Sequence, residues 1–192
     1  MSLQPRDAVI VDYARSAMGR SKNGCFRNVR ADDISAAIIK GLLARNPQLD
    51  PNTIDDLLWG CVMQREEQAF NVARNILLLA GLPVGVSGTT INRLCGSGMD
   101  AVLVAARAIA AGEAGLMIAG GVESMSRAPF VMPKAESAFS RANAVYDTTI
   151  GWRFVNKRMK ELYGVDSMPE TAENVATDHK IEREAQDRMA LA

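Results

Sequence analysis

The 192-residue sequence has no surplus of charge of either sign, because 22 Lys and Arg residues balance 22 Asp and Glu residues. Proteins that grip nucleic acid or carry an acidic tail need such a surplus, so we expect no nucleic-acid partner. The longest uncharged stretch, residues 75–92, is interrupted by glycine and proline, so we expect no membrane insertion. The polar start is unlike a secretory signal, and three widely separated cysteines favour reduced thiols in a cytoplasmic protein.

Motifs for bound cofactors are also missing. The cysteines have no Cys-x-x-Cys spacing and no histidine nearby, so we expect no metal site. Glycine-rich phosphate loops and the G-x-S-x-G elbow of α/β-hydrolases are absent too. The single histidine, His179, lies in a charged run that is typical of a solvated helical face, so we do not expect it to be a catalytic base.

Short apolar runs alternate with segments of helical period through residue 121. Strands are predicted at residues 8–12, 57–62, 88–91 and 115–119, and helices at 34–43, 71–80 and 97–111. Because the predicted strands are apolar on both faces, this alternation indicates an α/β sheet covered by helices.

The sequence changes character at residue 122. Aromatic residues and methionines gather between 122 and 170 without a clear period, as is typical of a lid or binding loop. Residues 167–170 are predicted to form a capping box, and Ile181, Ala185 and Met189 follow at helical spacing. Because this helical pattern runs to the last residue without a stop signal, we expect the chain to be the front part of a longer protein.

The segment N-R-L-C-G-S-G at residues 92–98 is the strongest candidate for chemistry. It would place Cys95 between a strand and a helix, where free N–H groups and the helix dipole stabilise a thiolate and an oxyanion. Small residues at 96–98 would let a bulky thioester approach the sulfur. The alternative is a buried cysteine packed at a tight turn. A nucleophilic cysteine also needs a base, and the chain offers no good candidate.

Other candidate residues have simpler interpretations. Cys25 and Cys61 stand at no predicted helix start and are interpreted as structural. The Gly120-Gly121 pair could allow close backbone approach, although such a pair more often makes a tight turn. Glu123 and Glu173 could be acids in a cleft, but solvated carboxylates are more common.

Five segments, in the right order and spread over nearly the whole chain, resemble the N-terminal half of thiolases. They are R-S-A-M-G at 15–19, N-V-A-R at 71–74, N-R-L-C-G-S-G at 92–98, G-G-V-E-S-M-S at 120–126, and Met168 followed by T-A-E-N at 171–174. The resemblance implies a thiolase-like α/β fold, the N-terminal half of a layered αβαβα architecture. Residues 1–121 would form an incomplete core, residues 122–192 would begin an inserted loop domain over the substrate tunnel, and the C-terminal half would be absent.

The resemblance also implies a CoA-dependent acyl transfer with acyl-CoA and CoA as substrates and no cofactor. Cys95 would attack a 3-ketoacyl-CoA, release acetyl-CoA and pass the shortened acyl group to free CoA, while Met168 would line the acyl pocket. The family takes a histidine, a second cysteine and an asparagine from its C-terminal half, so this chain would need that half. The family further implies a homodimer or homotetramer.

Two features bear on the substrate and disagree. Residues 121–130, 147–152 and 166–170 resemble 3-oxoadipyl-CoA thiolases of aromatic degradation, whereas residues 1–20 resemble thiolases of fatty-acid β-oxidation. We give the loop segments more weight because they would face the substrate. Ser167 and Pro169 stand where many acetoacetyl-CoA thiolases have histidine and glycine, so acetyl-CoA C-acetyltransferase activity is the alternative.

Three further hypotheses stay open on the sequence. A decarboxylating ketosynthase would share the fold and the nucleophile, but it would need paired histidines. A non-catalytic acyl-CoA or lipid carrier on the thiolase fold is opposed by the intact Cys95 segment. A structural fragment without activity is the third.

Overall fold

The computed structural model describes Gln4 and residues 6–192. The chain forms two units, of which the first ends at Pro129 and the second begins at Phe130. The first unit holds the sheet and the hydrophobic core, so it positions the candidate site.

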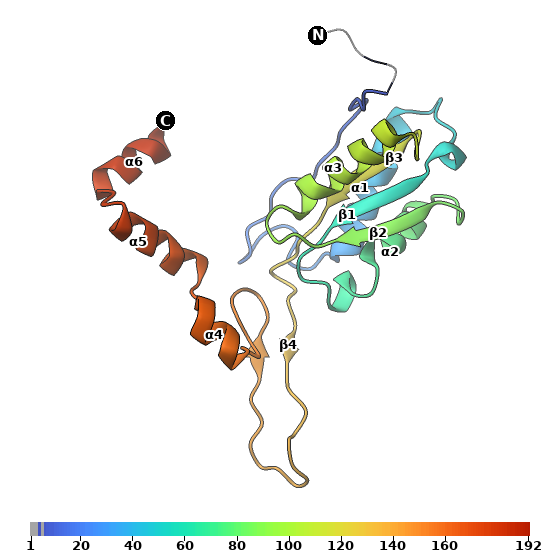
Figure 1. The fold of residues 1–192 in the computed structure, drawn as a ribbon. Helices are drawn as coiled ribbons and strands as arrows, with labels where there is room; N and C mark the ends of the chain where they lie inside the picture. Colours follow the sequence, from blue (N-terminus) through green and yellow to red (C-terminus); the bar gives the residue numbers. More distant parts are fainter. Residues whose placement is uncertain (1–3, 5) are drawn as a thin grey trace. The chain divides into compact units, whose positions relative to one another are not determined.

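Three parallel strands form the sheet of the first unit, β1 (Asp56–Gly60), β2 (Ser87–Ile91) and β3 (Met117–Gly121). β1 is central, in the order β2-β1-β3 (Figure 1). At the end of β1, Gly60 lies opposite Ile91 on one side and Gly121 on the other. The carboxyl ends of the three strands therefore meet at one edge of the sheet.

Helices cover both faces of this sheet. α1 (Ala31–Arg45) and α2 (Val72–Ala80) lie on one face, and α3 (Ser97–Ala111) lies on the other (Figure 1). Because side chains alternate along a strand, Leu57 and Trp59 enter the core with α1 and α2, whereas Leu58 packs against α3. The 3₁₀ helices η1 (Pro51–Thr53) and η2 (Glu66–Gln68) lie in the connections. The prediction of an α/β sheet covered by helices is confirmed.

The two helices with clear end signals lie close to their predicted bounds. Asn71 caps α2 by accepting a hydrogen bond from the Arg74 N–H, and α2 ends at Gly81 with a φ of +83°. α3 spans residues 97–111 as predicted and ends at Gly112 with a φ of +79°. Both glycines adopt the left-handed conformation in which glycine is least strained.

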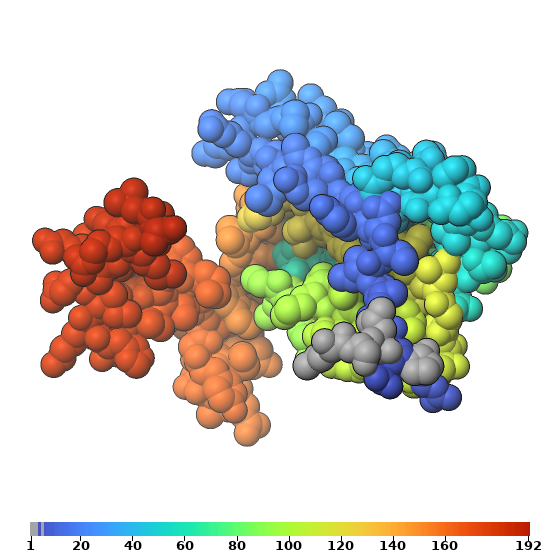
Figure 2. All heavy atoms as spheres, turned by 90° about the horizontal axis from the view of Figure 1, so that it is seen from above, coloured from blue at the N-terminus to red at the C-terminus, as the bar shows by residue number. Residues whose placement is uncertain are grey.

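The strand predicted at residues 8–12 is wrong. The segment pairs with no strand in the described part of the chain, and Ile10 and Val11 are 79% and 81% exposed. Its Asp12 carboxylate instead accepts hydrogen bonds from Arg45 and Asn46 at the end of α1. Figure 2 shows the segment, in blue, on the surface. An apolar run forms a strand only where the edge of a sheet is available to pair with it.

The second unit has short elements and almost no buried residue. β4 (Phe130–Val131) and β5 (Tyr146–Asp147) pair antiparallel, and α4 (Lys157–Tyr163), α5 (Met168–Asp178) and α6 (Arg183–Leu191) follow. Thr148 is the one buried residue from Phe130 to Ala192, all of which the structure describes.

The predicted capping box at the start of α5 is confirmed. Ser167 accepts from the Glu170 N–H, and the Glu170 carboxylate accepts from the Ser167 N–H at 2.6 Å. Of the three residues at helical spacing, Ala185 and Met189 lie in α6, whereas Ile181 lies in the turn between the helices, because α5 ends at Asp178 and Lys180 has a φ of +51°. The N–H groups of Lys180 and Ile181 bond back to Thr177 and Ala176, which closes the helix in a Schellman motif without glycine.

One stretch of the described residues, Leu94–Ala111, is long and apolar enough by length and composition to cross a membrane. It consists of α3 and the three residues before it. Here α3 packs on the sheet through Ala101 and Ala105, and Asp100 pairs with Arg93. These contacts are those of a helix that covers a sheet, and such helices pass the same test of length and composition.

Candidate active site

The loops that follow the three strands lie together at the carboxyl edge of the sheet. Residues 61–63 follow β1, residues 92–96 follow β2, and residues 122–124 follow β3. The Asn92 side chain donates to the Val62 carbonyl at 3.1 Å, and the Val62 N–H donates to Glu123 at 3.0 Å. Ligands of open parallel sheets bind at this edge, so it is the candidate site.

Cys95 lies in the loop between β2 and α3, as the sequence predicts, and it is exposed. The alternative of a buried cysteine is therefore wrong. The N–H groups of Gly96 and Ser97 are already used, since they donate to the carbonyls of Arg93 and Leu94. Among the described residues, the N–H groups of Gly98 and Met99 have no such acceptor outside the helix, which leaves helix-start donors for an oxyanion.

Buried polar side chains of α3 brace this loop. The Ser97 hydroxyl accepts from the Arg93 N–H at 2.8 Å and donates to the Leu94 carbonyl at 2.5 Å. Asp100 pairs with Arg93 at 3.0 Å. Ser97 and Asp100 are only 4% and 8% exposed, so they are part of the packing and Cys95 is carried on a fixed support.

Two glycines let the backbone pack tightly near this support. A Cβ atom at Gly60 would lie 2.6 Å from the Gly98 nitrogen, and one at Gly120 would overlap the Trp59 ring. The interpretation of Gly120-Gly121 as a tight turn is therefore wrong, because both residues belong to β3. Their small size instead allows the sheet and its neighbours to approach closely.

Glu123 is a structural anchor in this arrangement. Its carboxylate accepts from the N–H groups of Val62 and Met63 at 3.0 and 3.2 Å, and from the Gln68 amide at 2.8 Å. Glu123 is exposed, as expected, but its carboxylate is not free, because the loop after β1 presents two N–H groups to it. Glu173 is exposed, as expected.

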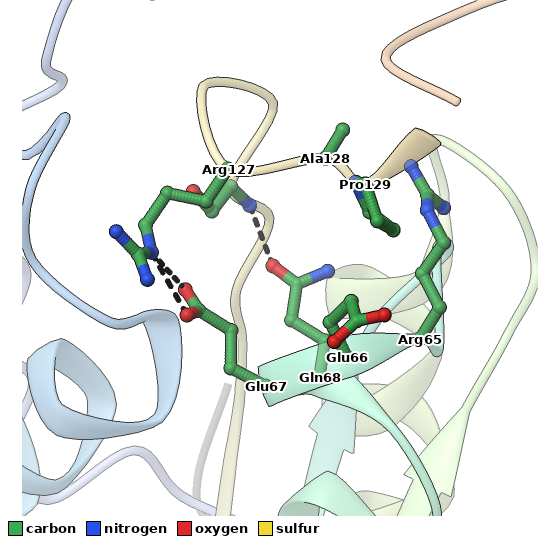
Figure 3. Close-up of a pocket in the computed structure, with 8 residues that line it drawn as sticks. Arg65, Glu66, Glu67, Gln68, Arg127, Ala128 and Pro129 are labelled. Carbon is green, nitrogen blue, oxygen red and sulfur yellow. Dashed lines mark hydrogen bonds and ion pairs between the residues drawn. The ribbon is translucent and has the colours of Figure 1, made fainter. Parts of the chain in front are cut away.

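Gln68 continues the anchor on the other side of Glu123. Its carbonyl oxygen accepts from the Ser124 N–H at 2.7 Å (Figure 3), and the residue is 4% exposed. Nearby, Arg127 pairs with Glu67, and both side chains line a small pocket with Pro129 (Figure 3). That pocket has a volume of about 10 Å³, room for about one water molecule and far too little for a CoA thioester.

The other predicted residues fall as follows. Cys61 is buried, and burial together with the nearby Glu123 carboxylate raises its pKa to about 12, so it is an inert structural thiol, as predicted. Cys25 is exposed, so burial gives it no structural role. His179 is exposed and caps the end of α5, as its charged surroundings predict.

Met168, predicted to line the acyl pocket, is the first residue of α5 and is 68% exposed. Within the described residues, no group of three or more His, Cys, Asp or Glu side chains could hold a metal ion.

The sequence prediction missed the structural use of Asn92 and Gln68. Asn92 is visible in the sequence as an asparagine three residues before a candidate nucleophile, and asparagine often bonds its own backbone two residues on. Gln68 gives no comparable signal, because the two partners that make it part of the anchor, Glu123 and Ser124, lie 55 and 56 residues away.

Comparisons with known proteins agree with this geometry. Residues 8–192 match the family model described as thiolase, N-terminal domain. The 3-oxoadipyl-CoA/3-oxo-5,6-dehydrosuberyl-CoA thiolase of Escherichia coli K12 is 61% identical over 97% of this chain and 46% of its own length. The 3-ketoacyl-CoA thiolase of Saccharophagus degradans is 54% identical over 98% of this chain and 44% of its own length. The chain thus spans about half the length of these curated relatives.

A solved structure gives the same result at lower identity. The acetyl-CoA acetyltransferase of Bacillus anthracis superposes with a TM-score of 0.72 and 31% identity, over 88% of this chain and 41% of that one. The predicted thiolase-like α/β fold is confirmed. The chain belongs to the thiolase family and corresponds to its N-terminal domain.

Proposed function

We propose that the protein is a CoA-dependent acyltransferase that cleaves 3-ketoacyl-CoA, with Cys95 as the nucleophile. The observation that carries the proposal is the exposed Cys95 thiol, held between β2 and α3 at the carboxyl edge of a parallel sheet. A cysteine with this exposure and this support has access to a thioester, whereas Cys61 does not.

In the proposed reaction the Cys95 thiolate attacks the C3 carbonyl carbon of the substrate. The C2–C3 bond then breaks, and the departing acetyl-CoA carbanion takes up a proton to give acetyl-CoA. The acyl group stays on Cys95 as a thioester until the thiol of a second CoA attacks it and releases the cysteine. The free N–H groups at the start of α3 would stabilise the oxyanion of each addition step.

The names of the relatives support a substrate with a second carboxylate or a fatty chain. At 61% identity the relative is named for 3-oxoadipyl-CoA, and at 54% for 3-ketoacyl-CoA. The acetyl-CoA acetyltransferase is only 31% identical. We infer 3-oxoadipyl-CoA as the substrate, with a fatty 3-ketoacyl-CoA next, and cytoplasmic localisation.

We further infer that activity needs a C-terminal half and a homo-oligomer. The outer side of α3 supports this, because Met99, Val102 and Leu103 are 69%, 40% and 44% exposed. A row of apolar side chains on a central helix favours a covering partner. The proton donor that the cleavage step requires also lacks a candidate near Cys95 among the described residues.

The test is the mass of the protein after incubation with acetyl-CoA, for this chain and for the protein expressed from its complete gene. We expect acetylation of the complete protein and no acetylation of a Cys95→Ser variant. Cys25→Ser is the matched control, because it removes an exposed thiol far from the site in sequence. A complete protein that stays unmodified would contradict the proposal and favour a non-catalytic acyl-CoA carrier.

A further inference from the structure

The residue before Cys95 has a strained backbone. Leu94 has a φ of +47°, in the left-handed region that leucine rarely adopts. Such a conformation persists only where neighbouring groups hold it, and it is common at functional sites. Because Leu94 directly precedes Cys95, whatever holds Leu94 also sets the direction in which the chain presents the thiol.

Ser97 holds the carbonyl of Leu94, and the N–H of Leu94 is held by the side chain of Asn92. Its Oδ1 atom accepts from the Leu94 N–H at 3.0 Å, and its Nδ2 atom donates to the Val62 carbonyl at 3.1 Å. One amide therefore fastens the strained residue to the loop that follows the neighbouring strand. Neither bond involves Cys95 itself.

The acceptor that Asn92 uses is itself fixed. Val62 donates its N–H to Glu123, and the preceding Cys61 N–H donates to the Ile91 carbonyl at the end of β2. Glu123 in turn accepts from Gln68. Hydrogen bonds thus connect the loops after all three strands, and the Asn92 amide links Leu94 to this network.

We propose that Asn92 is a positioning residue for Cys95, which keeps Leu94 in its left-handed conformation and so sets the position of the thiol for acyl transfer. The inference rests on the proposed function, in which Cys95 is the nucleophile. Small displacements of a reacting group slow a reaction strongly without weakening substrate binding, so the effect belongs to the rate of acylation.

The test compares variants of the protein expressed from its complete gene. Asn92→Ala removes both bonds, whereas Asn92→Asp keeps the acceptor for Leu94 and loses the donor to Val62. Asn46→Ala is the matched control, because the Asn46 amide also makes two bonds, to Asp12 and to the Leu42 carbonyl, at the end of α1. Adding Leu94→Gly to Asn92→Ala tests the backbone argument, since glycine takes a positive φ without strain.

Two readouts separate positioning from folding. The first is the rate of Cys95 acetylation at increasing acetyl-CoA concentration. The second is alkylation by iodoacetamide, followed for each cysteine by peptide mass spectrometry. Cys61 is 1% exposed, so it reacts only if the fold opens, and the exposed Cys25 serves as the reference for a thiol outside the site.

We expect Asn92→Ala to lower the maximal acetylation rate by about tenfold or more, with the half-saturating acetyl-CoA concentration changed by less than about twofold. The maximal rate of Asn92→Asp should lie between those of Asn92→Ala and the unmodified protein. Asn46→Ala should match the unmodified protein, and adding Leu94→Gly to Asn92→Ala should restore part of the lost rate. Cys61 should stay unreactive throughout. Should Asn92→Ala expose Cys61, Asn92→Asp becomes the deciding variant.

An acetylation rate within about twofold of the original in a variant that keeps Cys61 protected would overturn the inference. If the unmodified protein is not acetylated at all, the proposed function fails, and alkylation then decides the inference. Displacement from the positive end of the α3 dipole should slow Cys95 alkylation about threefold or more relative to Cys25. An unchanged ratio of the Cys95 alkylation rate to the Cys25 alkylation rate would overturn the inference.

Discussion

Leu57 and Phe139 are both large apolar residues, yet Leu57 is fully buried in the first unit and Phe139 is fully exposed in the second. The contrast holds for the whole units. In the first, the sheet, α1 and α2 enclose one cluster of buried apolar side chains. In the second, no helix has a buried residue. The first unit is therefore stabilised by burial, and the second by local hydrogen bonds.

This difference in burial agrees with the role that we propose for each unit. The first carries Cys95, whose position depends on a rigid support. The second presents exposed aromatic side chains, such as Phe130, Trp152 and Tyr163, of the kind that mark surfaces for other molecules. The low burial of the second unit is what we expect of the inserted loop domain that the resemblance predicts for residues 122–192.

The largest expected effect comes from truncating the core. Leu57→Ala should lower the free energy of unfolding by about 2–5 kcal/mol, because it leaves a cavity between β1 and the helices. The matched change in the second unit, Phe139→Ala, should alter it by less than about 0.5 kcal/mol. Urea denaturation followed by tryptophan fluorescence measures both. Similar losses for the two variants would break the comparison.

Alkaline pH should weaken the first unit through Cys61. Its pKa is raised to about 12 in the folded state, against an ordinary value of 9.0. Between these values the unfolded chain loses the thiol proton and the folded chain keeps it, so stability falls as the pH rises. The slope from this one group reaches about 1.4 kcal/mol per pH unit at most.

The measurement is urea denaturation at several pH values from 8 upward. Cys61→Ala should flatten the alkaline loss relative to the unmodified protein, after a constant cost for the lost sulfur. Cys25→Ala should leave the slope unchanged, because Cys25 is exposed. Equal slopes for the protein and for Cys61→Ala would show that burial of this thiol does not control alkaline stability.

Features that depend on local signals in the sequence could be predicted, whereas features that depend on distant contacts could not. α2 and α3 were predictable because Asn71, Gly81 and Gly112 are local signals that the folded chain uses directly. The position of Cys95 between strand and helix followed from the same signals, whereas only the structure shows that the thiol is exposed. The family motifs then gave the fold, but they could not give the role of each residue within it.

The remaining features could not be predicted, because most of them depend on contacts between residues that are distant in sequence. The apolar run at residues 8–12 has the composition of a strand, but pairing depends on an edge distant in sequence. The anchors of Asn92 and Glu123 depend on the register of β1 with β2 and β3, which brings Val62 within reach of residues 30 and 61 positions away. The end of α5 was missed because a lysine stands where glycine normally signals it.

A smaller effect is expected at the start of α5, where local bonds replace a core. Ser167→Ala removes the cap on the Glu170 N–H and should destabilise the helix by about 1 kcal/mol. Hydrogen exchange of residues 168–178 should accelerate, while exchange in α2 stays unchanged. Thr177→Ala is the control on the same helix. If α2 responded together with α5, the two units would share one cooperative transition, and the comparison would need revision.

The smallest effect is the response of this helix to acid. Hydrogen bonds from the Ser167 N–H and hydroxyl lower the pKa of Glu170 below its usual value of 4.5. Because the folded pKa is depressed, the stabilisation is present above the usual value and is lost as the pH falls through the folded one. Carboxyl NMR should show Glu170 titrating at lower pH than a free glutamate, and Glu170→Gln should remove the acid response of α5 hydrogen exchange. Titration of Glu170 at the usual value would mean that the box is open in solution, so that the second unit would lack even its best local support.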